Sequence, residues 1–289
     1  MYVIETEDLS FVYGKDTPFE KTANDKLNIQ IKQGEFVGII GHTGSGKSTL
    51  MQMLNGLIKP TSGVVRLNGD DIWKSPKEIR NIRFKVGLVF QYPEYQLFEE
   101  TVEKDIAFGP GNMGLDQEEI KHRVKTSAAF TGLKPELLSK SPFELSGGEK
   151  RRAAIAGVIA MDPDVLILDE PTAGLDPAGR DVLLAQISQY HNERKNTVLL
   201  VSHSMEDIAR IADRVLVMNN GRVAMFDETK KVFSRADELE SMGLRVPQVT
   251  KIIFKLREMG YSLPLGVLTV EQAANELQAL LDKQLKIRR

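Results

Sequence analysis

The sequence predicts an α/β fold in which helices cover both faces of a mainly parallel sheet. Three nearly uninterrupted apolar runs, at residues 86–90, 165–168 and 197–201, are typical of strands that are buried on both faces. Segments with helical periodicity separate these runs, which is the element order of a parallel sheet. Because ligands bind at the carboxyl ends of such strands, functional residues are expected at that edge.

Two further units are expected before and inside this core. Apolar and polar residues alternate over 3–13 and 27–31, and this period of two indicates half-buried antiparallel strands. Between about residues 98 and 161 the strand signals vanish and helical patterns dominate. The clearest helical patterns there cover 118–130 and 148–160. The sequence therefore predicts an N-terminal antiparallel β subdomain and an inserted helical subdomain.

A hairpin and a helical appendix complete the chain. Residues 215–225 hold two apolar runs around Asn220-Gly221, a pair that readily supplies the positive φ angles of a tight turn. Apolar residues over 249–259 then follow one helical face that ends at Gly260. Residues 269–272 form a capping box ahead of a second helical pattern.

A complete phosphate-binding loop, Gly-His-Thr-Gly-Ser-Gly-Lys-Ser, lies between a short apolar run and a helical pattern. Its glycines let the backbone N–H groups point inward at a helix N-terminus, which attracts a polyphosphate. Lys47 is expected to reach the β- and γ-phosphates of ATP, the Ser48 hydroxyl to bind Mg²⁺, and Thr49 to contact the α-phosphate. An ordinary glycine-rich turn is the weaker interpretation. The residues expected to bind nucleotide here are Gly41, His42, Thr43, Gly44, Ser45, Gly46, Lys47, Ser48 and Thr49.

Four polar residues follow the predicted parallel strands at the same edge. Asp169 is expected to support Mg²⁺, mainly through its water shell, and Glu170 to act as the general base that polarises the attacking water. His203 is expected to bond near the γ-phosphate, and Gln91 to bind Mg²⁺ or position water. Taken singly, each residue is also compatible with a structural turn at a strand end.

A second anion-binding element is predicted at residues 145–149, Leu-Ser-Gly-Gly-Glu, which precede an alanine-rich helical pattern. Ser146, Gly147 and Gly148 present N–H groups at the positive end of a helix dipole. The chain has one nucleotide loop, so this helix end is expected to face ATP that is bound to another subunit. Each ATP site would then be composite.

These motifs resemble those of the nucleotide-binding subunits of ABC transporters, over roughly the first 225 residues. By this resemblance, 41–48 is the Walker A loop, 145–149 the signature and 168–170 the Walker B end. The implied fold is a P-loop NTPase cassette with a RecA-like core at 1–225, including a helical subdomain at about 98–161. Residues 226–289 would form a C-terminal helical domain that serves dimerisation.

The resemblance also gives roles to single residues. Gln91 is similar to the Q-loop glutamine, His203 to the switch histidine, and Asp176 to the end of the D-loop, where it is expected to lie at the nucleotide. Tyr13 takes the place of an aromatic residue that stacks on adenine, although a ring in the core is the alternative. The signature has Glu149 where many transporters have glutamine. No catalytic group is missing, so active ATP hydrolysis is expected around Glu170.

Finer features are similar to energy-coupling factor (ECF) transporters for vitamins and transition-metal ions. Residues 90–98, Phe-Gln-Tyr-Pro-Glu-Tyr-Gln-Leu-Phe, carry this similarity, and 170–177 is most similar to the second of two paired ATPases. The resemblance implies a heterodimer with a homologous ATPase in preference to a homodimer. Both ATPases would dock on a transmembrane coupling subunit that carries a substrate-binding membrane subunit. Glu94, Glu99 and Glu100 are available acids for arginines of that coupling subunit, although a solvated acidic face is the favoured interpretation for any one of them.

Composition limits the other functions. Among 289 residues, 38 Lys and Arg balance 40 Asp and Glu, and the net charge of −2 gives no global field for nucleic acid, so no nucleic-acid partner is expected. The chain has no cysteine, which excludes disulfides and cysteine-bound zinc. No run approaches the roughly 20 apolar residues of a membrane span, so a peripheral protein at the cytoplasmic face of the cell membrane is expected.

Two alternatives are also compatible with the sequence. The chain is compatible with the ATPase of another ABC importer. A DNA-repair or chromosome-maintenance ABC ATPase is the less favoured alternative, because such proteins carry a very long coiled coil between Q-loop and signature. The interval from Gln91 to Leu145 is short and has no sustained heptad pattern.

Overall fold

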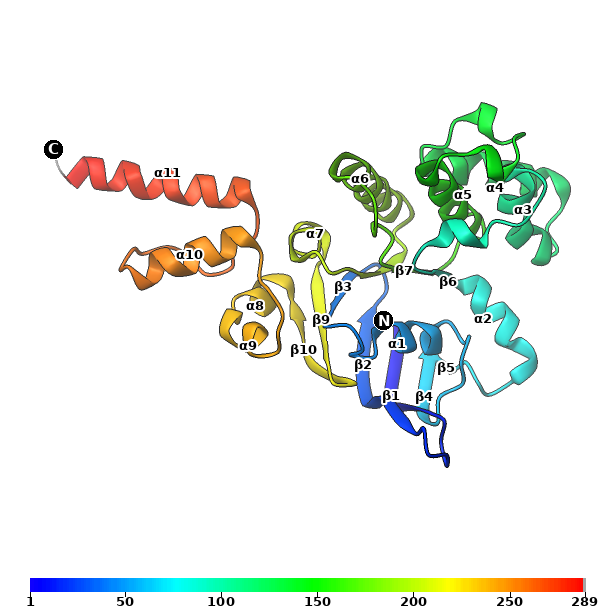
Figure 1. Cartoon of the computed structure of the whole chain (residues 1–289), viewed down its shortest axis with the longest axis horizontal. Coiled ribbons are helices and arrows are strands. Elements are labelled where there is room, and N and C mark those ends of the chain that lie inside the picture. Colours follow the sequence, from blue (N-terminus) through cyan, green and yellow to red (C-terminus); the bar gives the residue numbers. More distant parts are fainter. Residues whose placement is uncertain (288–289) are drawn as a thin grey trace.

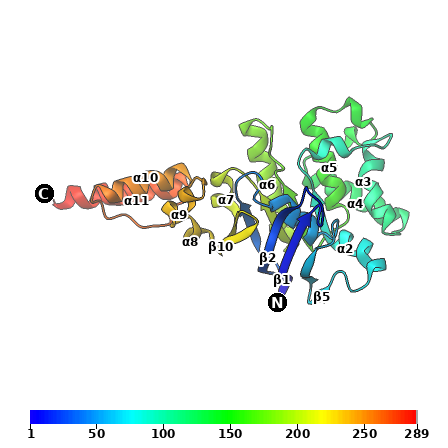
Figure 2. The same ribbon diagram turned by 60° about the horizontal axis from the view of Figure 1, so that its bottom comes forward.

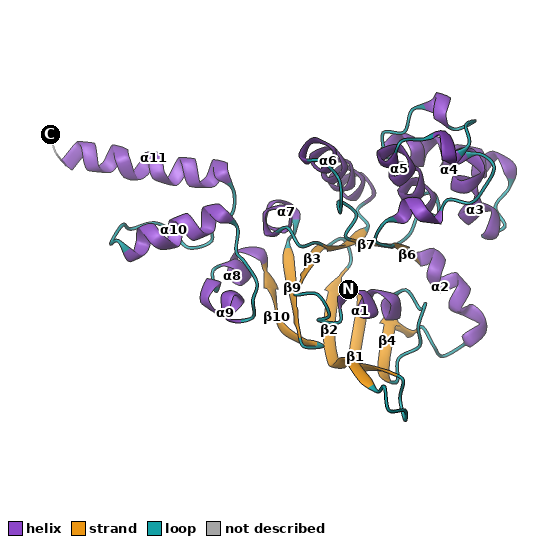
Figure 3. Cartoon of the chain, viewed as in Figure 1, coloured by secondary structure: helices purple, strands orange, loops and turns teal. Residues whose placement is uncertain are grey.

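The computed structural model describes the backbone of residues 1–287 and the side chains of residues 1–282. Residues 288–289, the last two of the predicted C-terminal domain, lie outside the described part. The two β-sheets form a central body, with a lobe of helices on one side and a pair of helices on the opposite side (Figure 1). Colouring by secondary structure separates the central strands from these two helical regions (Figure 3).

The larger sheet has the strand order β10-β9-β3-β8-β7-β6. All neighbours pair in parallel except β9 and β10, which form an antiparallel hairpin. Asn220 and Gly221 turn this hairpin with φ angles of 47° and 75°, as the sequence predicts. The predicted parallel core is therefore confirmed. Its strands are β3 (Phe36–Ile40), β6 (Val86–Val89), β7 (Val165–Asp169), β8 (Thr197–Val201), β9 (Arg214–Asn219) and β10 (Arg222–Glu228).

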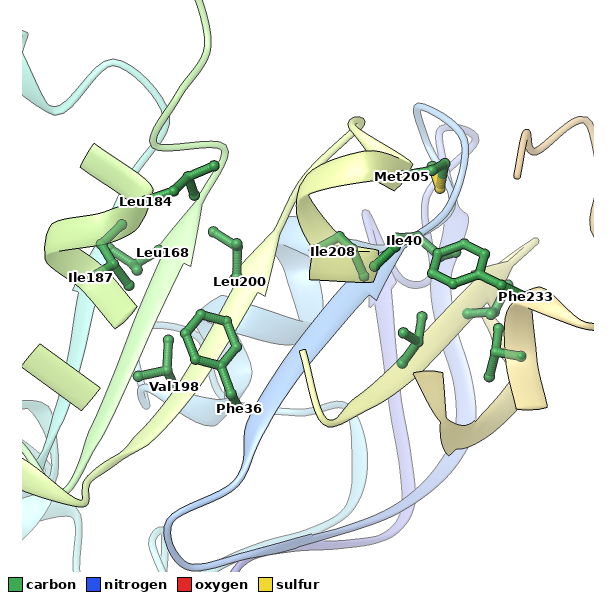
Figure 4. Close-up of a cluster of buried hydrophobic side chains, with 14 of the residues drawn as sticks. Phe36, Ile40, Leu168, Leu184, Ile187, Val198, Leu200, Met205, Ile208 and Phe233 are labelled. Atoms are coloured by element: carbon green, nitrogen blue, oxygen red, sulfur yellow. The ribbon is translucent and has the colours of Figure 1, made fainter. Parts of the chain in front are cut away.

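The parallel strands are apolar throughout because each face of the sheet belongs to a different core. Alternate residues point to opposite faces of a strand. Phe36 and Ile40 of β3 join one buried cluster, and Val37 and Ile39 join the other. Helices α6 (Pro177–Arg194) and α7 (Met205–Ile211) cover the first face, as the close-up in Figure 4 shows. Helix α1 (Lys47–Leu54) contributes to the second cluster.

A smaller antiparallel sheet packs on the second cluster. Its order is β2-β1-β4-β5, and its register places Lys21 opposite Tyr13. Ile4, Leu27 and Val65 are buried members of the cluster shared by both sheets. The predicted antiparallel subdomain is therefore present. Its strands are β1 (Tyr2–Tyr13), β2 (Lys21–Lys32), β4 (Ser62–Leu67) and β5 (Asp70–Asp71).

A helical lobe is inserted between β6 and β7. It has its own core, to which Val102, Val124 and Ala153 contribute from three different helices. A polar side chain caps the N-terminus of each of the three helices. Thr101, Asp116 and Ser146 each accept a hydrogen bond from a backbone N–H in the first turn. The helices are α3 (Val102–Asn112), α4 (Gln117–Phe130) and α5 (Gly147–Ile159), and α2 (Ile79–Lys85) precedes β6.

The C-terminal helices divide into two groups. Phe233 and Leu239 bury themselves in the core of the large sheet, whereas Ile253 and Ala273 belong to a small separate cluster. Figure 2 shows the second group, α10 and α11, projecting from the body as an arm. The hairpin strand β10 runs beyond residue 225, so the predicted cassette boundary falls inside it. The helices are α8 (Thr229–Phe233), α9 (Ala236–Ser241), α10 (Gln248–Glu258) and α11 (Val270–Ile287).

Among the described residues, no helix has both the length and the apolar composition that a membrane span requires.

Candidate functional site

The phosphate loop joins β3 to α1 and is shaped by its glycines. Gly46 has a φ of 97°, and a Cβ there would lie 2.4 Å from the Ala23 carbonyl oxygen. Any other residue would therefore combine backbone strain with a clash against β2. The Asn24 side chain donates to the Gly46 carbonyl at 3.2 Å. The smaller sheet thus fixes the turn that leads into α1.

Lys47 lies at the start of α1 with only 6% of its surface exposed. Its ammonium donates to the carbonyls of Gly41 at 2.7 Å and His42 at 3.0 Å, which fixes two of its three protons. Burial lowers the Lys47 pKa, and the charges of Glu170 and Asp169 oppose this effect. The Lys47 amino group is therefore held in the loop close to two carboxylates.

Asp169 ends β7 beside Ser48 and is buried. Burial raises the Asp169 pKa, while a hydrogen bond from the Ser48 hydroxyl and the charge of Lys47 oppose this shift. A hydroxyl and a carboxylate are oxygen ligands of the kind that Mg²⁺ uses together with water and substrate phosphates. Within residues 1–282 no group of three or more His, Cys, Asp and Glu side chains could hold a metal ion by itself. The pair therefore fits a Mg²⁺ that arrives with a triphosphate.

Glu170 receives one partner on each carboxylate oxygen. His203 Nε2 lies 2.8 Å from Oε1, and Gln91 Nε2 donates to Oε2 at 3.0 Å. Glu170 has a φ of 51°, a left-handed conformation that costs of order 1–3 kcal/mol outside glycine. Such strain is maintained only where surrounding contacts favour it. Three strand ends that are distant in sequence thus place their polar residues around one carboxylate.

These residues surround a cavity of about 320 Å³, which we call the loop cavity. Tyr13 lines it, with 45% of its surface exposed, and its hydroxyl is 3.1 Å from Thr49 Oγ1. Its ring also meets Phe11 edge-on at 4.8 Å, so it combines a packing contact with exposure to the cavity. The cavity is lined by Tyr13, Lys21, Ala23, Thr43, Gly44, Gly46, Lys47, Ser48, Thr49, Gln91, Glu170 and His203.

Lys21 and Ala23 are the lining residues that sequence reasoning missed. They lie in β2, where no motif marks them, and the register of β1 with β2 brings Lys21 opposite Tyr13. Only a prediction of that pairing could have found them. Conversely, three expected loop residues do not line the cavity. Gly41 and His42 contribute carbonyls to Lys47, and Ser45 is fully buried.

The signature residues form the tip of α5, outside the lining of the loop cavity. Ser146 donates from its hydroxyl to the Glu149 carboxylate at 2.7 Å and from its backbone N–H at 2.9 Å. The Glu149 N–H donates in return to Ser146 Oγ at 3.4 Å. The two hydrogen bonds that Ser146 donates to the carboxylate lower the Glu149 pKa. The tip, which includes Gly147 and Gly148, is thus stabilised by a capping box within its own helix.

Two other expected residues lie elsewhere. Asp176 caps α6 by accepting from the Gly179 N–H at 3.2 Å, and it does not line the loop cavity. Glu94 was expected to be an available acid, and this expectation is wrong. Its carboxylate is paired with Arg151 at 2.6 Å, and only 15% of its side chain is exposed. The pairing was not foreseen because the two residues lie in separate motifs.

Comparison with known proteins places this arrangement in a family. The ABC transporter family profile matches residues 24–173. The chain is 55% identical to the energy-coupling factor transporter ATP-binding protein EcfA2 of Clostridium tetani, over 97% of this chain and 98% of that protein. It is 54% identical to the EcfA2 protein of Caldanaerobacter subterraneus, over 95% and 96% of the two chains.

Solved structures agree with the sequence relatives. The structure of cbiO1 from Clostridium perfringens, part of the ABC transporter complex cbiONQ, superposes with a TM-score of 0.74 and 37% identity, covering 90% of this chain and 97% of that one. A dimeric post-hydrolysis structure of the ATP-binding cassette MJ0796, bound to ADP and phosphate, gives a TM-score of 0.71 at 27% identity, over 78% and 98%. The chain therefore belongs to the ABC transporter family, among the ATP-binding proteins of energy-coupling factor transporters.

Proposed function

We propose that this chain is the second ATPase subunit of an energy-coupling factor transporter, and that it hydrolyses ATP to power the uptake of a water-soluble vitamin or a transition-metal ion. The observation that carries the proposal is the position of Glu170. Its carboxylate is bonded by Gln91 and His203 in a cavity that also contains Lys47 of the phosphate loop.

ATP enters the loop cavity with its phosphates against the backbone N–H groups of the loop and its adenine against Tyr13. Lys47 places its ammonium at the β- and γ-phosphates. Ser48 and Asp169 would hold Mg²⁺, and the ion would supply positive charge that neutralises the phosphate oxygens. The other loop residues orient the triphosphate for attack at its γ-phosphorus.

Glu170 then polarises the water that attacks the γ-phosphorus and accepts its proton as the bond to the leaving oxygen breaks. Gln91 and His203 orient this carboxylate, Gln91 through a hydrogen bond and His203 through the close approach of its Nε2. His203 also reaches the γ-phosphate when it is present, so its contact depends on whether ATP or ADP is bound. The reaction yields ADP and phosphate.

A second, homologous ATPase supplies the other half of each site. The α5 tip of this chain, at Ser146 to Gly148, binds the γ-phosphate of ATP on the partner, and Asp176 lies at the same interface. The support is twofold. The tip does not line the chain's own loop cavity, and the related cassette MJ0796 is described as a dimer with nucleotide products bound. We favour a heterodimer because 170–177 is most similar to the second of two paired ATPases.

The membrane subunits dock on the segment that follows Gln91. This segment exposes Tyr95 and Phe98, at 85% and 61%, and Phe98 stacks edge-on against the exposed Phe108 at 5.0 Å. Exposed aromatic clusters of this kind mark protein interfaces. The transmembrane coupling subunit therefore contacts aromatic side chains here, and it carries the substrate-binding membrane subunit. The chain acts as a peripheral protein at the cytoplasmic face of the membrane.

The arm formed by α10 and α11 is an additional dimer contact. It is the projecting part of the predicted C-terminal domain at 226–289, whose first residues complete β10 and whose helices α8 and α9 pack on the main core. Ile252 and Met259 on α10 expose 52% and 71% of their surfaces, which is compatible with cover by the corresponding arm of the partner.

The test is purification of the full chain, expressed with its neighbouring genes, from detergent-solubilised membranes. We expect an integral membrane protein and a homologous ATPase to copurify, and the complex to hydrolyse Mg-ATP. An importer complex without an ECF-type coupling subunit would favour the ATPase of another ABC importer. Copurification with DNA would favour a chromosome-maintenance function, and absence of ATP hydrolysis would contradict the proposal.

A further inference from the structure

A buried arginine connects three functional segments of the chain. Arg151 lies in α5, close behind the signature tip, and 5% of its side chain is exposed. Its Nε and Nη2 donate to the two carboxylate oxygens of Glu94 at 3.0 and 2.6 Å. Its Nη1 donates to the carbonyl of Pro171 at 3.1 Å and to that of Ala173 at 2.5 Å.

Only an arginine can make this set of contacts at once. The guanidinium is planar and presents its N–H donors in a rigid fork, which matches one carboxylate on one edge and leaves further donors for carbonyls. Burial by itself raises the Glu94 pKa, but the hydrogen bonds and charge of Arg151 outweigh it and the pKa is lowered. The pair is therefore a charged one in a largely buried environment. Loss of either partner leaves the other without compensation.

Each contact reaches a different part of the ATPase. Ser146 caps the N-terminus of α5, and we assign this residue to ATP on the partner. Pro171 follows Glu170 directly, and the Ala173 N–H donates to the Glu170 carbonyl at 3.1 Å in a tight turn. Arg151 thus holds the two carbonyls of the turn that begins at the catalytic carboxylate. Glu94 lies in the 3-10 helix after Gln91, on the segment that faces the membrane subunits.

A small cavity lies between the α5 tip and the start of α6, next to Arg151. Its volume is about 110 Å³, and Gly148, Arg151, Leu175 and Asp176 are among its lining residues. The cavity reduces direct packing between the α5 tip and the start of α6. Beside it, Arg151 donates four hydrogen bonds that join α5 to the segments at Glu94 and at 171–173.

We propose that Arg151 is a positioning residue that couples the two ATP sites to which this chain contributes. Through α5 it sets the signature tip for ATP on the partner. Through Pro171 and Ala173 it sets the loop that carries Glu170 for ATP on this chain, and Glu94 joins both to the membrane-facing segment. This inference rests on the proposed function and adds to it a residue that makes the two sites respond together.

The experiment uses the purified transporter complex with Arg151→Lys, which keeps the charge but cannot form the fork. Glu94→Gln with Arg151→Met is the second variant, because it leaves no buried charge unpaired. The matched control is Arg123→Met. Arg123 also bonds a carboxylate and two carbonyls, at Ala160 and Met161, but all of these lie in or at the edge of the helical lobe.

We expect both Arg151 variants to lower Mg-ATP turnover at least tenfold, and the Arg123 control to change it less than twofold. Amide hydrogen exchange in a Glu170→Gln background gives the second readout. With wild-type Arg151, we expect Mg-ATP to slow exchange at 146–149 and at 172–175 together. With Arg151→Lys, we expect 172–175 still to slow, whereas 146–149 exchanges as it does without nucleotide.

Three results would overturn the inference. The first is an ATP turnover within twofold of wild type in both Arg151 variants. The second is slower amide exchange in both segments when Mg-ATP is added to Arg151→Lys. The third is faster exchange throughout the helical lobe without nucleotide, which would show that Arg151 only stabilises the fold. If the complex with wild-type Arg151 does not hydrolyse Mg-ATP, the proposed function itself fails, and this outcome is distinct from the other three.

Discussion

Helices α1 and α5 both begin with a serine- and glycine-rich tip, but the chain treats the two tips differently. The tip of α1 opens into the loop cavity, where Lys47, Gln91, Glu170 and His203 converge. The tip of α5 is closed by its own capping box, in which Ser146 and Glu149 bond each other. Both tips offer backbone N–H groups and a positive dipole end. Only the first has catalytic groups from the same chain.

Anion binding and catalysis are therefore separable in this fold. Parallel strands deliver polar residues to one edge of the sheet, so the α1 tip acquires Asp169 and Glu170 from β7 as a consequence of topology. The α5 tip belongs to the inserted lobe, which has its own core and is not part of that edge. It needs a second chain to become part of a site.

The largest effect is expected at the first tip from Glu170→Gln. Loss of the general base should lower the turnover of the ATPase complex by about 10²- to 10⁴-fold, while the affinity for ATP stays within about threefold. Turnover and binding of a fluorescent ATP analogue measure the two quantities. Glu119→Gln on α4 is the control and should leave both unchanged. An equal loss of affinity and turnover would show that Glu170 binds nucleotide and does not act in the chemical step.

Replacement of one glycine by alanine in each tip should affect stability and ATP turnover differently. Gly147→Ala should not disturb the folded chain, because no atom lies within 4 Å of the added Cβ. It should lower turnover of the complex about tenfold by obstructing the partner's phosphate. Gly46→Ala should instead destabilise the chain itself, by more than about 1 kcal/mol, because the Cβ would meet the Ala23 carbonyl at 2.4 Å with φ at 97°.

The melting temperature and the ATP turnover of both variants test these expectations. The melting temperature of Gly147→Ala should equal or exceed that of the wild type, since alanine favours a helix over glycine by about 0.5–1 kcal/mol. Wild-type turnover in Gly147→Ala would contradict the role of the α5 tip. A normal melting temperature in Gly46→Ala would contradict the account of the loop.

Asp169→Asn should have opposite effects with and without ligand. The Asp169 pKa is raised in the folded chain, chiefly by burial, so the cost in stability grows as the pH rises from the unfolded to the folded pKa and is complete above the folded pKa. Asparagine removes that cost, and the melting temperature without nucleotide should rise at pH 7. The added stability from Mg-ATP, about 2.7 kcal/mol at a ligand concentration of 100 times Kd for the wild type, should largely disappear.

The same variant should respond to pH in a defined way. As pH falls through the folded Asp169 pKa the wild-type carboxyl takes up a proton, so the difference in melting temperature between Asp169→Asn and wild type should shrink. A lower melting temperature of the variant at pH 7 would mean that the bonds with Ser48 and Lys47 outweigh the cost of burial.

The smallest effect is expected at the far end of the loop cavity, from Tyr13→Phe. This change removes only the hydroxyl contact with Thr49, and the KM for ATP should rise no more than about threefold. Tyr13→Ala also removes the ring and should raise KM about tenfold through lost stacking. Equal KM values for the two variants would favour the alternative that the ring serves packing against Phe11 alone.

The sequence predicts the parts of the site that are contiguous in the chain. The strand, loop and helix around Lys47 form one local unit, and the uninterrupted apolar strands reveal that the sheet is buried on both faces. The shared edge of parallel strands then explains why Glu170 and His203 meet. Each of these predictions depends on local patterns and on one rule of topology.

What the sequence does not predict are contacts that depend on register or on packing between units. Lys21 enters the loop cavity through the antiparallel register with Tyr13, which no local pattern specifies. Glu94 and Arg151 are 57 positions apart and in different elements, so their charges alone gave no reason to pair them. The short helices α8 and α9 are held by burial of Phe233 and Leu239 in the main core, and not by helical periodicity of their own.

The most direct test of the central claim is a structure of the Glu170→Gln complex with its homologous ATPase and Mg-ATP. We expect Ser146 Oγ and the N–H groups of Gly147 and Gly148 to lie about 3 Å from γ-phosphate oxygens of ATP bound to the partner. ATP in the phosphate loops with the α5 tip out of hydrogen-bond reach of every phosphate would contradict the composite site.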